Sequence, residues 1–172
     1  MKANQQIFSP VPSEVVTETW QEMSAMSVEA IPALMAQMGS EQPALLAYLL
    51  AVSEANFDTQ EAELVVYLGT VIWQMMHRWH RQLMQVSIKK LEQAEEDSFT
   101  ELESMSKITE TSMWTHVQFM LETYPEPEVL RYIVEALVEA DPDEVQLSDD
   151  RIGLAFVYLK TTLDALIRCR VK

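Results

Sequence analysis

The chain has 172 residues, 48% of them hydrophobic, and its 27 acidic and 12 basic side chains leave a net charge of −15. With only three glycines and no alternating strand pattern, this composition predicts a mostly helical globular protein with a substantial core. The negative charge argues against direct binding of nucleic acid or of an anionic membrane, because the long-range field repels polyanions. It is compatible with a basic protein partner, and equally with solubility as its only role.

The first twelve residues (1–12) end in a proline-rich segment and predict an extended arm, whereas residues 13–172 are expected to form a single all-helical domain. The longest apolar run, Ala44 to Val52, is too short to cross a bilayer, and the first residues lack the apolar run of a secretory signal. Cys169 is the only cysteine, so no internal disulfide can form. These features predict a cytoplasmic protein.

The N-terminal third predicts three helices. Ser13 can cap the first of them, and a short helix follows over Pro32–Met38. The next segment, Pro43–Val52, is apolar on every side, which predicts a central helix that its neighbours cover all round. Asp58 or Thr59 is then expected to cap a longer helix, because both side chains accept hydrogen bonds from exposed backbone amides.

The stretch Thr70–Tyr124 contains neither glycine nor proline. A single helix of this length would measure about 80 Å, which is too long for a domain of this size. Ser98 followed three residues later by Glu101 forms a capping-box pattern and predicts a turn at 96–98. We therefore expect a long antiparallel helical hairpin, with a basic first arm lying along an acidic second arm.

Two further helices are expected after the hairpin, over Glu128–Ala140 and from Ser148 or Asp149 to Cys169. The predicted fold class is therefore all-α, a helical bundle of six to seven helices organised around the long antiparallel hairpin.

A faint internal repeat accompanies this pattern. Val66-Tyr67-Leu68-Gly69-Thr70 recurs as Val157-Tyr158-Leu159-Lys160-Thr161, and Pro43–Tyr48 resembles Pro127–Tyr132. Chance similarity between two leucine-rich helices is the alternative explanation, because apolar patterning alone generates such matches.

If the repeat is real, two related halves cover residues 43–96 and 127–172. Two tyrosine pairs would then occupy equivalent positions, namely Tyr48 with Tyr132 and Tyr67 with Tyr158.

The three histidines of the chain are the one candidate metal or acid–base site. In a hairpin that turns at 96–98, His77 and His80 on the first arm lie at the level of His116 on the second. Imidazoles three residues apart on a helix can share a metal ion. Structural histidines in the seam between two helices are the alternative, since no cysteine and no Glu-x-x-His motif accompanies them.

An acidic segment near the C-terminal end of the chain is a candidate surface for a basic partner. It contains Glu126, Glu128, Glu135, Glu139, Asp141, Asp143, Glu144, Asp149 and Asp150. A solvated acidic rim without a partner is the alternative. Eleven methionines add flexible side chains, which fill irregular cores and also suit surfaces that accept varied partners.

The leading hypothesis is a non-enzymatic helical interaction or adaptor module that acts through an acidic, methionine-rich surface. The chain shows no phosphate-binding glycine loop and no nucleophile motif, so an enzyme is not favoured, and no cofactor is expected apart from the alternative of a histidine-bound metal. A second alternative is an acidic inhibitor that occupies the basic surface of a nucleic-acid-binding protein. Pairing with a second copy of the chain is also compatible with long helices.

Overall fold

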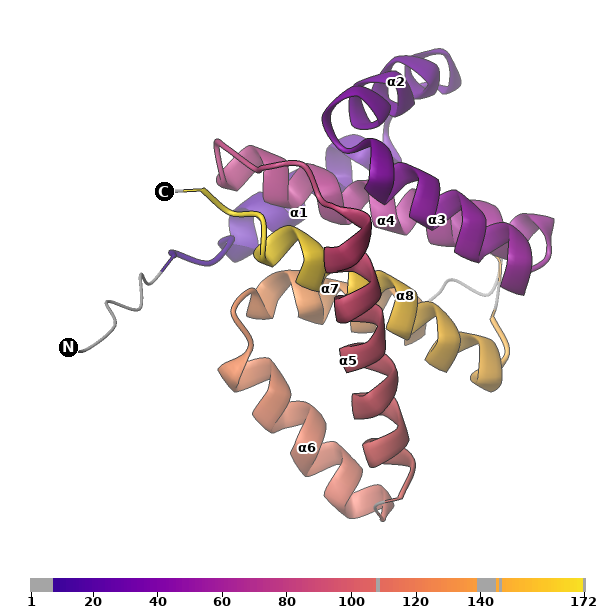
Figure 1. Ribbon diagram of the computed structural model, residues 1–172, viewed down its shortest axis with the longest axis vertical. Helices are drawn as coiled ribbons and strands as arrows, with labels where there is room; N and C mark the ends of the chain where they lie inside the picture. Colours follow the sequence, from indigo (N-terminus) through magenta and orange to yellow (C-terminus); the bar gives the residue numbers. More distant parts are fainter. Residues whose placement is uncertain (1–7, 108, 139–144, 146, 172) are drawn as a thin grey trace.

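The structure is a computed structural model, and it describes residues 8–107, 109–138, 145 and 147–171, with residues 110–114 and 149 described by their backbone only. Over these residues the chain forms eight α-helices and one short 3-10 helix (Figure 1). The helices are α1 (Ser13–Ser24), η1 (Val28–Ala30), α2 (Ile31–Glu41), α3 (Pro43–Asn56), α4 (Thr59–Trp79), α5 (Ile88–Ser106), α6 (Glu110–Thr123), α7 (Pro127–Val138) and α8 (Asp149–Ile167).

The predicted fold class, an all-α helical bundle, is confirmed, although the bundle has eight α-helices rather than six or seven. The extended pairing within the described part of the chain is a single bridge between Leu83 and Arg170. None of the helices described is long and apolar enough to span a membrane.

The predicted turn at 96–98 is wrong, because α5 runs through these residues without a break. Leu91, Ala94 and Ser98 recur at helical spacing and form the buried face of α5, so tertiary packing overrides the local capping pattern. The chain breaks instead between Trp79 and Ser87, whose hydroxyl accepts a hydrogen bond from the Lys90 amide at 3.3 Å. The main neighbour of α5 is α8, and the predicted hairpin of a basic and an acidic arm does not form there.

The bases of the predicted first arm accordingly find other partners. Arg78 pairs with Glu22 of α1, and its guanidinium lowers the pKa of that carboxyl group. Lys90 lies at the start of α5, and its Nζ is 3.1 Å from the backbone oxygen of Arg168 and 3.3 Å from Cys169 Sγ.

The central helix is α4 rather than α3. Residues 68–76 of α4 are all buried, because α1, α3, α7 and α8 surround it. The expectation that Pro43–Val52 would be covered all round is wrong, since only Leu45, Leu49 and Ser53 of α3 are buried and Leu50 is 48% exposed. One side of an apolar helix is therefore left open to solvent.

A close approach between α3 and α4 occurs at Gly69. A Cβ atom at this position would lie 2.6 Å from Leu49 Cδ2, and the Leu49 side chain is fully buried. We expect Gly69→Ala to lower the free energy of unfolding, because overpacking costs about 1–3 kcal/mol and exceeds the gain of about 1 kcal/mol in helix propensity. Urea unfolding followed by circular dichroism would measure the change.

The matched control is Gly153→Ala in α8, where nothing lies within 4 Å of the new Cβ atom. This variant should raise the free energy of unfolding by about 0.5–1 kcal/mol, since only helix propensity changes. Stabilisation of the same size at Gly69 would contradict the close contact with Leu49.

The helices fall into two sets of four with corresponding contacts. In the first set α1 packs on α4, α2 on α3 and α3 on α4; in the second set α5 packs on α8, α6 on α7 and α7 on α8. Between the sets α4 lies against α8, α3 contacts α5 and α8, and α7 contacts α1 and α4. Figure 1 shows α2 and α6 at opposite ends of the molecule.

Two buried polar residues support this correspondence. Gln42 precedes α3 and accepts a hydrogen bond from the Val86 amide at 2.8 Å, just before α5. Glu126 precedes α7 and accepts one from the Val11 amide at 2.7 Å, just before α1. The internal repeat stays a prediction, but residue 96 lies inside α5, so the predicted boundary of the first half does not coincide with the end of a helix.

Candidate functional site

The three histidines each face a different glutamate. His77 Nδ1 is 3.1 Å from Glu41 Oε2, and His116 Nε2 is 3.9 Å from Glu101 Oε1. His80 Nε2 is 2.6 Å from Glu126 Oε1. Among the residues that the structure describes, no three His, Cys, Asp or Glu side chains are placed to hold a metal ion. Because the expected convergence depended on the turn at 96–98, the geometry gives a three-histidine metal site no support.

Glu126 does not belong to an exposed acidic surface, contrary to the prediction. Its side chain is completely buried, and Oε1 accepts hydrogen bonds from His80 at 2.6 Å and from Arg170 at 2.7 Å. Oε2 accepts the bond from the Val11 amide. The turn between α6 and α7 directs this carboxylate inward. Its hydrogen bonds connect the N-terminal arm (Val11), the end of α4 (His80) and the C-terminal tail (Arg170).

The rest of the predicted acidic surface is described only in part. Glu128 is half-buried beside Arg131, with 3.6 Å between Arg131 Nε and Glu128 Oε2, while Glu135 and Asp150 are exposed. The remaining predicted residues, Glu139, Asp141, Asp143, Glu144 and the side chain of Asp149, lie outside the described part of the structure.

The open side of α3 forms one wall of an apolar groove, which we call the methionine groove. Its volume is about 860 Å³, and its apolar walls come from α1, the segment that follows α1, α2, α3 and α4. The side chains that define it are Met23, Met26, Leu34, Met35, Leu50 and Phe57. This volume lies within the usual range for ligand-binding clefts.

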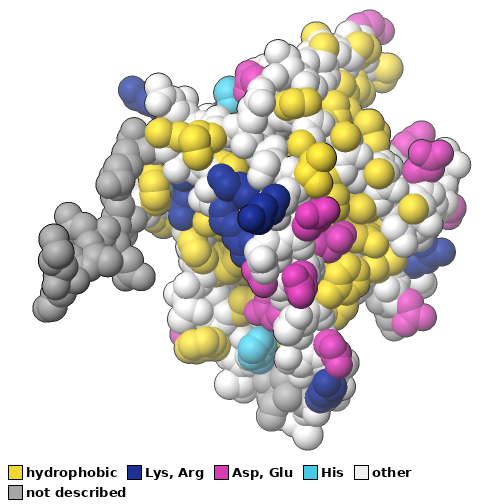
Figure 2. Space-filling model, in the orientation of Figure 1, with side chains coloured by type: hydrophobic (Ala, Val, Ile, Leu, Met, Phe, Trp, Pro, Cys, Tyr) yellow, Lys and Arg dark blue, Asp and Glu magenta, His cyan; other side chains and the backbone are white. Residues whose placement is uncertain are grey.

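The helix α2 covers this side of the core only in part, because Met38 is its only buried residue. Met38, near the end of α2, is fully buried, and its sulfur lies 3.7 Å from the Thr70 hydroxyl of α4. Ile31, at the start of α2, is 45% exposed and lines the groove. Figure 2 shows hydrophobic side chains on the surface over α2 and α3.

Among the described residues that line the groove, all charged side chains are acidic. Glu54 and Glu63 are exposed at its rim, and Asp58 caps α4 by accepting a hydrogen bond from the Glu61 amide at 2.9 Å. One base, Arg151, stacks on the Phe57 ring at 5.6 Å and lies 3.9 Å from Glu61. The rim therefore carries a negative potential that favours basic groups.

The sequence left open whether its methionines fill the core or form a surface, and the structure shows both uses. Met75, Met76 and Met120 are buried in the core, whereas Met26 and Met35 line the groove. The signal for the groove was present in α3, because a helix that is apolar on every side must be covered on every side or expose an apolar strip.

Comparison of the chain with models of protein families, with curated proteins and with solved structures found no match. The fold and the groove define the class as an all-α helical bundle that carries an open apolar groove with an acidic rim.

Proposed function

We propose that this protein is a non-enzymatic binding module whose methionine groove takes the apolar face of a basic amphipathic helix from a partner protein. The observation that carries the proposal is a groove of about 860 Å³ with apolar walls and with acidic side chains as its only charged lining. An amphipathic helix buries its apolar stripe in such a groove and keeps its charged face at the rim.

Methionine in the groove walls supports a peptide as the occupant. Met23, Met26 and Met35 have unbranched side chains that adjust to the shape of a bound side chain at little cost. Surfaces of this kind accept related sequences rather than one rigid ligand. Leu50 and Ile31 add exposed apolar area at the mouth, where an aromatic or aliphatic anchor would dock.

The acidic rim supports a basic partner. Glu54 and Glu63 are exposed, and the whole chain carries a charge of −15, so a positively charged helix is attracted from a distance. Cys169 is buried within reach of Lys90, and a single free thiol supports the cytoplasm as the location of this interaction.

Reversing the charge of the rim should weaken binding of a basic helix. The probe is a synthetic peptide with leucines at helical spacing and lysines on its other face, titrated by isothermal calorimetry. We expect the double variant Glu54→Lys/Glu63→Lys to raise the dissociation constant at least about tenfold, equal to about 1.4 kcal/mol. Both side chains are exposed, so the fold should not change.

The matched control is Glu92→Lys/Glu96→Lys. It changes the net charge by the same amount, and both positions are exposed on α5, away from the groove. This variant should bind the peptide nearly as well as the original chain, and a peptide with glutamates in place of lysines should not bind. Equal weakening by both double variants would show that overall charge, and not the groove, attracts the peptide. Light scattering would reveal whether a second copy of the chain occupies the groove instead.

A further inference from the structure

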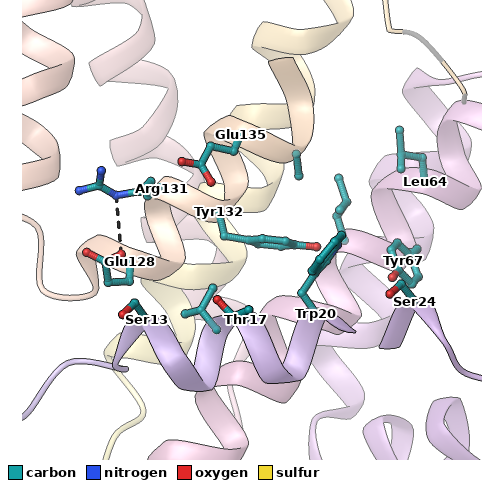
Figure 3. Close-up of a pocket in the computed structure, with 13 residues that line it drawn as sticks. Ser13, Thr17, Trp20, Ser24, Leu64, Tyr67, Glu128, Arg131, Tyr132 and Glu135 are labelled. Carbon is teal, nitrogen blue, oxygen red and sulfur yellow. Dashed lines mark ion pairs between the residues drawn. The ribbon is translucent and has the colours of Figure 1, made fainter. Parts of the chain in front are cut away.

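A second cavity lies between α1, α4 and α7, and we call it the tyrosine pocket (Figure 3). Its volume is about 500 Å³, and Trp20, Ser24, Tyr67 and Tyr132 are among the residues that line it. Of the described lining residues, it shares only Tyr67 with the methionine groove. The two are therefore separate sites that adjoin at that tyrosine.

The hydroxyl group of Tyr132 has no hydrogen-bond partner among the residues that the structure describes. Tyr132 is 9% exposed, and Figure 3 shows its ring pointing from α7 into the pocket, with the hydroxyl beside Trp20. Burial raises the pKa of this hydroxyl, and the nearby Tyr67 raises it further. The group is therefore a neutral hydrogen-bond donor whose unmet bond costs free energy in the empty pocket.

In the other set of helices, the tyrosine at the corresponding place has a hydrogen-bond partner. There Tyr48 of α3 donates a hydrogen bond to Glu95 Oε1 of α5 at 2.8 Å. Tyr48 also packs edge-on against Tyr158 of α8 at 6.3 Å, and Phe99 of α5 packs against the same Tyr158 ring at 6.1 Å. A carboxylate oxygen and an aromatic ring thus complete the site.

The buried positions show which residues of the two sets of helices correspond to one another. Val11 and Val86, whose amides are bound in the same way, are 75 residues apart in the chain. The same separation relates the buried positions of the two following helices, which are Val16, Thr19 and Met23 in α1 and Leu91, Ala94 and Ser98 in α5.

This register places Trp20 where α5 has Glu95, and Ser24 where α5 has Phe99. An indole cannot accept the hydrogen bond of Tyr132, because its N–H is a donor only. Serine is too small to occupy the volume that a phenyl ring fills. The pocket therefore lacks two groups that its counterpart contains, namely a hydrogen-bond acceptor and an aromatic ring.

The charge around the pocket decides between an anionic and an uncharged hydrogen-bond acceptor. Glu128 and Glu135 line it together with Arg131, so the local balance is negative and an anionic ligand is disfavoured. Trp20 is 45% exposed, so a rotation of its indole toward solvent would uncover the Tyr132 hydroxyl.

We propose that the tyrosine pocket binds a small aromatic molecule that carries an uncharged hydrogen-bond acceptor. The acceptor receives the hydrogen bond of Tyr132, and the aromatic ring lies in the space beside Tyr67 that Phe99 fills in the counterpart. This site goes beyond the peptide-binding groove and does not depend on it.

Benzamide is a suitable probe, because it combines a phenyl ring with a neutral carbonyl acceptor. Titration of the full chain, followed by the NMR signal of the Trp20 indole N–H, should show saturable binding. Benzoate, which is anionic, and toluene, which has no acceptor, should bind more weakly. Absence of saturation with benzamide, or equal binding of all three compounds, would overturn the proposal.

The variant Tyr132→Phe tests whether the Tyr132 hydroxyl binds the ligand or stabilises the fold. Loss of this hydroxyl should weaken benzamide binding about tenfold without lowering the thermal midpoint, since the hydroxyl makes no hydrogen bond within the described part of the protein. The control Tyr48→Phe should lower the thermal midpoint, because it breaks the bond to Glu95, and should leave benzamide binding unchanged. Unchanged binding by Tyr132→Phe would refute the role of the hydroxyl.

Ser24→Phe gives the tyrosine pocket a phenylalanine at the position that corresponds to Phe99 of α5. This variant should abolish benzamide binding and maintain the thermal midpoint, since the new ring fills an existing cavity. Binding of the basic peptide to the methionine groove should not change, so that the two proposals succeed or fail independently. Undiminished benzamide binding by a folded Ser24→Phe variant would place the ligand elsewhere.

Discussion

Glu126→Ala should lower the free energy of unfolding by about 3–5 kcal/mol, because removing one member of a buried ion pair leaves the other charge buried without a partner. The carboxylate is fully buried and binds Arg170, His80 and the amide of Val11. Its loss leaves the Arg170 guanidinium, itself nearly buried, without its charge partner. Urea unfolding followed by circular dichroism would measure the loss.

Glu126→Gln tests which part of this effect is due to charge. A glutamine at 126 can still accept the bond of Val11, as Gln42 does for Val86 in the corresponding place. We expect this variant to lie between the original chain and Glu126→Ala, since the backbone contact remains and the charge pairing is lost. A loss below about 1 kcal/mol for Glu126→Ala would contradict the buried network.

The free energy of unfolding should also fall steeply above about pH 10. Burial raises the pKa of Tyr48, Tyr124, Tyr132 and Tyr158, with further contributions from Glu95 at Tyr48 and from Asp164 at Tyr124. The unfolded chain loses these protons near the ordinary tyrosine pKa of 10.0, whereas the folded protein keeps them. Raising the pH therefore favours the unfolded state.

The size of the effect follows from linkage. Each tyrosine that stays protonated in the folded state costs about 1.4 kcal/mol of stability per pH unit above its unfolded pKa. The strongly buried Tyr48, Tyr124 and Tyr132 together give roughly 4 kcal/mol per pH unit. Tyr158 acts in the same direction.

Lys160 adds to this alkaline instability. Burial alone would lower the pKa of Lys160, but Asp164 and Glu101, at 2.8 Å and 3.0 Å from its Nζ, raise it above the ordinary value of 10.5. The stability that this pairing contributes is present below the unfolded pKa and is lost as the pH rises through the folded pKa.

Urea unfolding at about pH 9 and at about pH 11 would measure the slope, and the near-ultraviolet absorbance of tyrosinate would follow ionisation directly. Tyr124→Phe should reduce the slope by about 1.4 kcal/mol per pH unit, because one raised group is removed. Tyrosines that all titrate near pH 10 in the folded protein would contradict this expectation.

Local chemistry made several helix starts predictable. Proline is tolerated in the first turn of a helix, and α3 and α7 begin at Pro43 and Pro127. Asp58 caps α4 as expected, through a full capping box with Glu61. The same type of pattern failed at Ser98, because the buried face of α5 continues through that residue and favours an unbroken helix.

The methionine groove could be predicted only in part. The apolar residues around α3 indicate that some of its surface needs a cover, but not that α2 leaves Leu50 exposed. The burial of Glu126 could not be predicted. Eight further acids in its segment indicated a surface residue, but the turn before α7 buries its side chain. Burial depends on contacts between distant segments, which no local pattern contains.

By itself, the sequence determined the all-helical class, the strong negative charge, the helix start at Pro43 and the helix cap at Asp58, because these depend on composition and on residues within a turn of one another. Only the tertiary structure decided where the long glycine-free stretch breaks, which glutamate is buried and which apolar faces stay open. Those outcomes depend on how α3, α4 and α8 pack together, and packing between helices far apart in the chain can override every local preference.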